Sequence, residues 1–358
     1  MTSADLAAAR VLDAPRIART VAGIRALQRP DGALPWFHGD KLDPWDHVET
    51  AMALDAAGEH EAARQAYLWL ARAQNPDGSW HANYADGDAG VAEVIDATRE
   101  TNFAAYPAVG VYHHFLATGD RRFLRRLWPT VAAAIEFVLR HQRSDGAIRW
   151  NPDVEDALLT GCSSIYQSLR CAVAVATTLG ENQPGWELAL SRLGHALTSH
   201  PEHFTPKERY SMDWYYPVLG TALRGEAARR RIDEGWDRFV VPSLGVRCLD
   251  DHPWVTGGET CELAIALWAI GREPQARRLL RDIGAQLRDG DGMYWTGYVY
   301  ADLAIWPQEK TSWTAGAMLL ALAALGGDAA TRTVFGGGSL PKPLPVDCAA
   351  EPCVSTAR

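Results

Sequence analysis

Two kinds of helical pattern alternate along this chain, and this alternation constrains its fold more than any other feature. In residues 129–142, apolar side chains recur at the three- and four-residue spacing of one helix face, at Val131, Ala134, Ile135, Val138 and Leu139. The same one-sided pattern lies at about 16–28, 60–74, 185–199, 225–239 and 274–287. A helix with a single apolar stripe covers a core from the outside.

Between these segments lie stretches without a polar face, such as the run CELAIALWAI at 261–270. They occupy about 45–57, 102–118, 161–179, 212–223, 259–270 and 311–325. A helix that is apolar all round must be covered on every side. This strict outer–inner order predicts an all-α fold, an (α/α)6 barrel of six helical hairpins with an inner and an outer ring.

The links between the segments alternate in length. Gly58, Gly119 and Gly271 stand where an inner helix would end and an outer helix would begin, so these links are short. The outer-to-inner links are long, at about 29–44, 75–101, 143–160, 200–211, 240–258 and 288–310. All long loops then lie at one end of the ring, where we expect the site. We predict one toroid domain over 1–326 and a flexible, Gly- and Pro-rich tail over 327–358.

A phrase of the form Gln-x-x-Asp-Gly opens three of the long loops, at 28–32, 74–78 and 142–146. A Trp follows each copy, at Trp36, Trp80 and Trp150. Asp-Gly is a turn signal, because Gly accepts positive φ. We interpret the repeated phrase as a staple of the ring rather than as a binding motif.

Bulk properties exclude several kinds of partner. The 358 residues carry a net charge of −9 with the two signs mixed, and no basic block is present, so we expect no nucleic acid. There is no apolar run of about 18 residues and no apolar stretch behind a basic lead, so we expect no membrane span and a cytoplasmic location. The oligomeric state is left open.

The six cysteines form no C-x-x-C pair, and reduced thiols are the expectation. Cys248 with Asp250 and His252 is a conceivable zinc site, but its spacing matches no strong metal pattern. We therefore expect neither a metal nor a cofactor.

The long loops combine acidic and aromatic residues, and the chain has 14 Trp. Each inner helix begins beneath such a loop, and helix N-termini carry free N–H groups and partial positive charge. Aromatic faces pack on the C–H surfaces of sugars, while carboxyl groups bind hydroxyls or transfer protons. Each carboxylate taken singly is explained as well by a helix-capping role as by a role in sugar binding or catalysis. The prediction of a sugar substrate therefore rests on the convergence of all six loops.

Three segments resemble the glucoamylase-like enzymes of the six-hairpin glycosidase superfamily, which are (α/α)6 toroids. The matching phrases are Thr118-Gly-Asp120, Leu127-Trp-Pro129, Ile135-Glu-Phe-Val138, Ile270-Gly-Arg272, Trp306-Pro-Gln308 and Ser312-Trp313. The resemblance covers about residues 15–326 in helix order. It implies a glycoside hydrolase that acts on a small glycoside or oligosaccharide by carboxyl acid/base catalysis.

The chain departs from that family at both catalytic positions. The family's proton donor is a Glu directly after a Trp, and here Asn151 follows Trp150. The family's base lies in the loop before the last inner helix, and here that loop has no Glu until Glu309. We therefore predict the acid among Glu155, Asp156 and Asp153, and the base as Glu309 or Glu259. The predicted substrate-binding residues are Trp45, Asp46, His47, Arg99, Glu100, Trp150, Asp213, Trp214, Arg247, Trp254, Trp295 and Trp313.

A second resemblance concerns the segment 70–80, which is similar to the QW repeat of triterpene cyclases and protein prenyltransferases, also α/α toroids. A cyclase would need an Asp-x-Asp-Asp motif, and only Asp86-Gly-Asp88 and Asp250-Asp251 are present. A prenyltransferase-like enzyme acting on an isoprenoid stays open as an alternative. So does a sugar-binding relative without catalysis, which the substitution at Asn151 favours.

Overall fold

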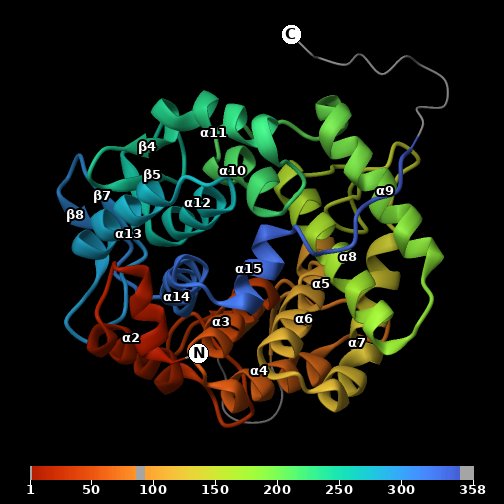
Figure 1. The fold of residues 1–358 in the computed structure, drawn as a ribbon, viewed down its shortest axis with the longest axis horizontal. Coiled ribbons are helices and arrows are strands. Elements are labelled where there is room, and N and C mark those ends of the chain that lie inside the picture. Colours follow the sequence, from red (N-terminus) through yellow and green to blue (C-terminus); the bar gives the residue numbers. More distant parts are fainter. Residues whose placement is uncertain (1, 86–92, 347–358) are drawn as a thin grey trace.

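The computed structural model describes residues 2–85 and 93–346 as two concentric rings of helices (Figure 1). The outer ring consists of α2 (Ala14–Leu27), α4 (His60–Ala73), α7 (Arg121–Leu139), α9 (Pro184–Ser199), α11 (Gly225–Phe239) and α13 (Glu273–Leu287). The inner ring consists of α3 (Pro44–Ala56), α5 (Thr101–Ala105) with α6 (Pro107–Thr118), α8 (Leu159–Leu179), α10 (Ser211–Leu219), α12 (Gly257–Ala269) and α14 (Ser312–Gly326). The prediction of an (α/α)6 barrel is confirmed.

The burial of the two helix types follows their sequence patterns. In α13 the buried side chains are Ala276, Leu279, Leu280, Ile283 and Leu287, which form one stripe. In α14 every residue from 314 to 325 is buried. The apolar all-round segments therefore form the inner wall because the outer ring and their inner neighbours cover them on every side.

Two helices differ from the predicted limits. The outer helix α7 begins eight residues before Pro129, because Asp120 caps it by accepting hydrogen bonds from the N–H groups of Arg122 and Phe123 at 3.0 and 2.9 Å. The second inner helix is divided into α5 and α6 at Tyr106, directly before Pro107. Proline is favoured at the start of a helix, where its missing N–H costs nothing.

The repeated Gln-x-x-Asp-Gly phrase is a ring staple, as predicted. The side-chain amide of Gln74 donates to the carbonyl of Gly78 at 3.0 Å and to that of Thr130 in the next outer helix at 2.9 Å. Gln28 and Gln142 make the equivalent pairs of bonds to their own loop and to the neighbouring outer helix. A Cβ on Gly78, which has a φ of +94°, would lie 2.1 Å from the Ala133 carbonyl oxygen. Glycine is therefore required for the turn to approach the next helix.

The long loops contain short strands that carry too few residues to show alternation. One antiparallel sheet has the order β1 (Lys41–Leu42), β2 (Asn83–Ala85), β3 (Val94–Asp96). The other has the order β4 (Val240–Val241), β5 (Gly245–Arg247), β6 (Trp254–Thr256), β7 (Gly297–Val299), β8 (Ala304–Ile305). In register, Val255 pairs with Tyr298, and Tyr298 pairs with Ile305. These sheets join neighbouring long loops at one end of the ring.

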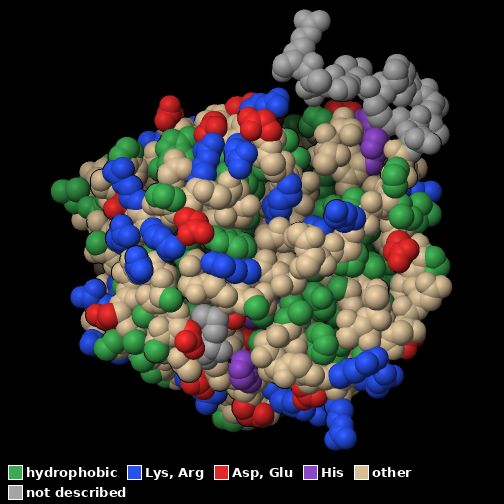
Figure 2. All heavy atoms as spheres, viewed as in Figure 1, with side chains coloured by type: hydrophobic (Ala, Val, Ile, Leu, Met, Phe, Trp, Pro, Cys, Tyr) green, Lys and Arg blue, Asp and Glu red, His purple; other side chains and the backbone are tan. Residues whose placement is uncertain are grey.

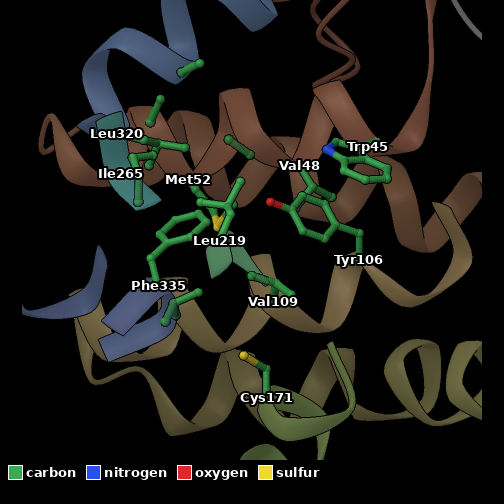
Figure 3. Close-up of a cluster of buried hydrophobic side chains, with 14 of the residues drawn as sticks. Trp45, Val48, Met52, Tyr106, Val109, Cys171, Leu219, Ile265, Leu320 and Phe335 are labelled. Atoms are coloured by element: carbon green, nitrogen blue, oxygen red, sulfur yellow. The ribbon is translucent and has the colours of Figure 1, made fainter. Parts of the chain in front are cut away.

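The opposite end of the ring is filled by the last described segment. Helix α15 (Ala329–Gly336) contacts α3, α6, α12 and α14, and its Phe335 lies among Met52, Leu219 and Ile265 (Figure 3). The Arg170 side chain donates to the carbonyls of Gly337, Leu340 and Pro341 at 2.6–3.1 Å, so it fastens the following residues.

We predicted a flexible tail from residue 327 onward. The described part of it, 327–346, is instead packed on the ring, because the short apolar pair Val334–Phe335 is buried despite the Gly-rich composition. Cys348 and Cys353 lie outside the described residues, as do Asp86 and Asp88 of the weak cyclase-like motif.

The N-terminal helices α1 (Ser3–Leu6) and η1 (Ala7–Ala9) pack against α14. Among the described residues, no single helix is long and apolar enough to cross a membrane; α14 and α15 together meet that test but are bent by 98°. Basic and acidic side chains are interspersed on the face shown in Figure 2.

Candidate active site

A cavity of about 390 Å³ opens at the long-loop end of the ring. Its wall is formed by Trp36, Lys41, Asp43, Trp45, Asp46, Asn83, Glu100, Phe103, Thr160, Met212 and Trp313. These residues belong to the starts of five inner helices and to the loops that precede them. Helix N-termini and aromatic rings therefore converge on one polar mouth, as the sequence predicted.

Asp43 and Asp46 form the start of α3. Asp43 is the N-cap: its Oδ1 accepts from the backbone N–H of Asp46 at 2.9 Å, and its Oδ2 accepts from the indole of Trp36 at 2.8 Å. Burial raises the pKa of the Asp46 carboxyl well above its ordinary value, and the negative charges of Asp43 and Glu49 raise it further. The cavity wall therefore favours the protonated form of Asp46 more than water favours that of an exposed aspartate.

Glu49 lies one helical turn deeper and holds the aromatic wall in place. Its Oε1 accepts from the Tyr106 hydroxyl at 2.8 Å and from the Trp45 indole at 3.3 Å, while its Oε2 accepts from the Trp313 indole at 2.9 Å. Burial raises the pKa of Glu49 to about 7, and the three hydrogen bonds oppose this rise. Figure 3 shows Tyr106 and Trp45 side by side within the cluster of buried side chains.

A second pair of carboxyl groups lies on α12, again three residues apart. Glu259 is in the first turn and Glu262 in the second, and both are buried. Oε2 of Glu262 accepts from the hydroxyl of Tyr215. Burial and the charge of Glu49 raise the pKa of Glu262 well above its ordinary value. Oε2 of Glu259 and Oε1 of Glu262 have no hydrogen-bond partner within the described chain.

The facing wall adds two further carboxyl groups. Oε2 of Glu100 accepts from the indole of Trp150 at 2.7 Å, and burial raises the pKa of Glu100. Burial also raises the pKa of Asp213 to about 6, against the opposing charge of Arg231. Asp213 directly follows cavity-lining Met212, and one of its oxygens has no partner among the described residues. The cavity is thus surrounded by acids whose protonated forms are favoured.

The structure brings part of the predicted set together at this cavity. Trp45, Asp46, Glu100 and Trp313 line it, and Trp150 supports Glu100 from behind. Asp213 and Glu259 lie in the first turns of α10 and α12, and both helices begin at the end of the ring that holds the cavity.

The three predicted acids of the third loop lie elsewhere. Asp153, Glu155 and Asp156 are exposed and are not among the residues that line the cavity. The Glu155 carboxylate pairs with Arg149 at 2.5 Å and its side chain is 76% exposed. At the start of this exposed segment, the side-chain oxygen of buried Asn151 accepts from the N–H of Asp153 at 2.8 Å.

Glu309, the predicted base, is half-buried beside the cavity residues of the first loop. Burial and the charge of Asp40 raise its pKa, and its carboxyl group contacts the Thr296 hydroxyl at 3.4 Å. It is not one of the residues that form the cavity wall.

Three further predicted residues have structural partners. His47 is fully buried, with Nδ1 accepting from the Leu34 N–H at 3.2 Å and Nε2 3.0 Å from the Ala66 carbonyl oxygen; burial lowers its pKa to about 4. Arg99 forms an ion pair with Asp77 at 2.9 Å. The indole of Trp214 donates to the Arg231 carbonyl at 2.7 Å, and its ring stacks on Phe239.

The last three predicted residues belong to the fifth and sixth long loops. Arg247 donates to the Tyr300 hydroxyl at 2.9 Å. The indole of Trp254 donates to the carbonyl of Trp306 at 2.8 Å. The Nζ atom of Lys310 lies 4.9 Å from the ring centre of Trp295.

Several residues that the structure places at the site are not among the predicted catalytic and substrate-binding residues. These are Trp36, Lys41, Asp43, Glu49, Asn83, Phe103, Thr160, Met212 and Glu262. A usable signal was present for the carboxyl groups: an acid within a helix that has no polar face must be buried. Asp46-x-x-Glu49 and Glu259-x-x-Glu262 are two such pairs, spaced so that both members share one helix face.

The conceivable zinc ligands have separate partners. Asp250 pairs with Arg238 and His252 with Asp251, while burial and the Glu259 carboxylate raise the pKa of the Cys248 thiol. Within the described ranges, one group has metal-ligand atoms within 4.8 Å of one another, namely His200, Glu202 and His203, which is not part of the cavity wall.

No protein-family model matches the chain. The chain is 52% identical over 354 residues to the "MMP endo-(1,4)-3-O-methyl-alpha-D-mannosidase" of Mycolicibacterium hassiacum, covering 97% of this chain and 96% of that protein. Among solved structures it resembles a glycosidase variant in complex with glucose (TM-score 0.69, 16% identity, 91% and 99% of the two chains). It also resembles a GH63 mannosylglycerate hydrolase from Thermus thermophilus (TM-score 0.65, 14% identity, 86% and 99%) and a D-mannose isomerase (TM-score 0.66, 11% identity, 87% and 96%).

The fold and the acid-lined cavity, together with these comparisons, define a glycoside hydrolase of the six-hairpin glycosidase superfamily. More closely, the chain belongs to the same family as the endo-mannosidase of M. hassiacum. The comparisons thus favour the glycoside hydrolase over the isoprenoid enzyme that the QW-like segment left open.

Proposed function

We propose that this enzyme cleaves internal α-(1→4) bonds in a glycan that contains 3-O-methylmannose, with Asp46 as the proton donor. The substrate is inferred from the name of the M. hassiacum relative, which is 52% identical to this chain. The observation that carries the catalytic assignment is the position of Asp46 in the cavity wall, with its pKa raised by burial and by neighbouring carboxylates. Glycoside hydrolysis requires a carboxyl group that is still protonated when the substrate binds.

Glu259 is the partner carboxylate in this proposal. It occupies the first turn of α12, and the helices on either side of α12 in the inner ring, α10 and α14, both contribute residues to the cavity. One of its oxygens lacks a hydrogen-bond partner among the described residues, and a buried acceptor of this kind is costly unless a ligand or water satisfies it. Glu262 lies one turn deeper and already accepts from Tyr215.

Two substitutions test the assignment. Asp46→Asn and Glu259→Gln keep the side-chain size but remove the acid or base, and each should lower kcat on a methylmannose oligosaccharide by at least about 100-fold. Glu155→Gln and Glu309→Gln test in parallel two sequence-based candidates that do not line the cavity, and both should stay within a few-fold of the parent enzyme. Full activity of Asp46→Asn would refute the proposed donor, and a loss confined to Glu155→Gln or Glu309→Gln would favour those two residues instead.

A further inference from the structure

Large apolar side chains are exposed mainly on the long loops. The exposed ones among the described residues are Val94, Ile95, Leu188, Tyr210, Leu303, Trp306 and Leu344. Five of these seven belong to the second, fourth and sixth long loops, at the end of the ring that holds the cavity. Grouped apolar exposure on a folded protein usually marks a binding surface.

Trp306 is the largest of these side chains, and its backbone is firmly held. Its N–H donates to the Gly297 carbonyl at 3.0 Å, and its own carbonyl accepts from the Trp254 indole at 2.8 Å. The two indoles meet edge to face with ring centres 5.2 Å apart. The Trp306 side chain is nevertheless 56% exposed. A rigid, exposed ring loses little conformational entropy when a ligand stacks on it.

The Trp306 segment is continuous with the cavity wall. Cavity-lining Trp313 is seven positions after Trp306, so the two lie at most about 25 Å apart. Between them, the carbonyl of Glu309 accepts from the N–H of Thr296 at 3.0 Å, and the N–H of Ser312 donates to the carbonyl of Trp36 at 2.7 Å. Trp306 therefore lies in the same long loop that leads into cavity-lining Trp313, at the end of the ring that holds the cavity.

We propose that Trp306, braced by Trp254 and flanked by Leu303, is an outer subsite for the part of the glycan that extends beyond the cavity. The inference rests on the proposed function. A cavity of about 390 Å³ is near the lower end of the range for one small ligand, so the chain on at least one side of an internal bond must cross the rim. The C–H faces and O-methyl groups of a methylated mannose chain would pack on the indole.

Substrate length separates this role from a general loss of structure. Trp306→Ala should lower kcat/KM about tenfold on the methylmannose polysaccharide and leave it unchanged on the shortest oligosaccharide that the parent enzyme cleaves. Trp306→Phe keeps an aromatic ring and should stay close to the parent on both substrates. Leu188→Ala removes an exposed apolar side chain from outer helix α9 and should change neither value. Equal losses on both substrates, or no loss on the polysaccharide, would overturn the subsite.

A binding measurement distinguishes failure of the subsite from failure of the proposed function. If the parent enzyme cleaves no mannoside, the function is refuted, and calorimetric titration with the intact polysaccharide still tests the surface. Weaker binding by Trp306→Ala than by the parent supports the subsite, and equal binding overturns it. The other possible occupant of this surface is a second copy of the chain, which light scattering tests. If the parent is a dimer and Trp306→Ala is a monomer that binds the polysaccharide equally well, the surface is a contact between copies and the subsite is overturned.

Discussion

The indole N–H of Trp313 donates to Oε2 of Glu49 at 2.9 Å, although the two residues are 264 positions apart in the sequence. The bond joins the last inner helix to the first and so closes the inner ring directly beneath the cavity. Because Trp45 and Tyr106 donate to the other oxygen of the same carboxylate, one buried acid sets the positions of two cavity walls.

Replacement of Glu49 should therefore disturb the aromatic wall. In Glu49→Gln, an amide NH2 would face a side chain that also donates, so at least one of the three hydrogen bonds is lost. We expect kcat/KM to fall at least about tenfold, with a change in the near-ultraviolet circular dichroism of the Trp residues. Glu61→Gln on outer helix α4, where the carboxylate contacts only Gln65 in the described structure, is the matched control. Unchanged kinetics and dichroism in Glu49→Gln would contradict this role.

The pH dependence of stability should reveal the raised pKa of Glu49. The pKa of Glu49 is about 7 in the folded protein, against 4.5 as the ordinary value, so folding favours its protonated form. Its contribution to stability is fully present below pH 4.5 and is lost as pH rises through 7, by roughly 3 kcal/mol. As pH rises from 4.5 to 7, the free energy of unfolding of the parent should fall relative to that of Glu49→Gln. A constant difference between the two proteins in calorimetry from about pH 4.5 to 7.5 would contradict the raised pKa of Glu49.

Activity should persist at neutral pH and fall on the alkaline side. The pKa of Asp46 is raised well above its ordinary value by burial and by nearby carboxylates, so the proposed donor should keep its proton to a higher pH than an exposed Asp does. We expect an alkaline limb in the profile of kcat/KM that disappears from the residual activity of Asp46→Asn. A profile that declines through about pH 4–5, as for an ordinary Asp, would argue against a raised pKa.

The glutamine staples should contribute measurably to stability. Gln74→Ala removes two hydrogen bonds to backbone carbonyls of two neighbouring elements, and we expect the free energy of unfolding to fall by about 1–3 kcal/mol in denaturant titration. Gln65→Ala, which removes only a contact with Glu61 on the surface of the same helix, should change it by less than about 0.5 kcal/mol. Similar values for the two variants would mean that the repeated phrase is not a staple.

The closing helix α15 should be part of the cooperative fold. Phe335 is 1% exposed and packs in the centre of the ring, so Phe335→Ala should cost about 3–5 kcal/mol. Leu344, 57% exposed on the following segment, should tolerate Ala within about 0.5 kcal/mol. A negligible effect of Phe335→Ala on the thermal midpoint would show that residues 327–346 are an appendage rather than a plug.

Periodicity was enough to predict the architecture. The single apolar stripe of α13 identifies an outer helix, and the all-round apolar surface of α14 identifies an inner helix. This follows because a helix buries the sides on which its apolar residues lie. The Gln-x-x-Asp-Gly phrase likewise predicted a turn whose glycine adopts a positive φ, and Gly78 does so. Helix limits were less predictable where a cap competed with a proline, as at Asp120 and Pro129.

The site was only partly predictable. Trp45, Asp46, Glu100 and Trp313 could be named because they stand at the starts of inner helices, which all meet at one end. The resemblance to glucoamylase-like enzymes directed attention to the third loop, where Glu155 pairs with Arg149 at the surface. No sequence pattern reports local bonds such as that between Asn151 and Asp153.

Local chemistry thus decided the helices, their alternation and the end of the ring at which polar groups gather. Long-range packing decided which of many acids are buried together, and therefore which of them keep a proton. Asp46 and Glu262 come from helices far apart in the sequence, yet the charge of Glu262 helps to raise the pKa of Asp46. Proximity and dehydration of this kind are properties of the folded ring, because the energy of a charge depends on what surrounds it in space.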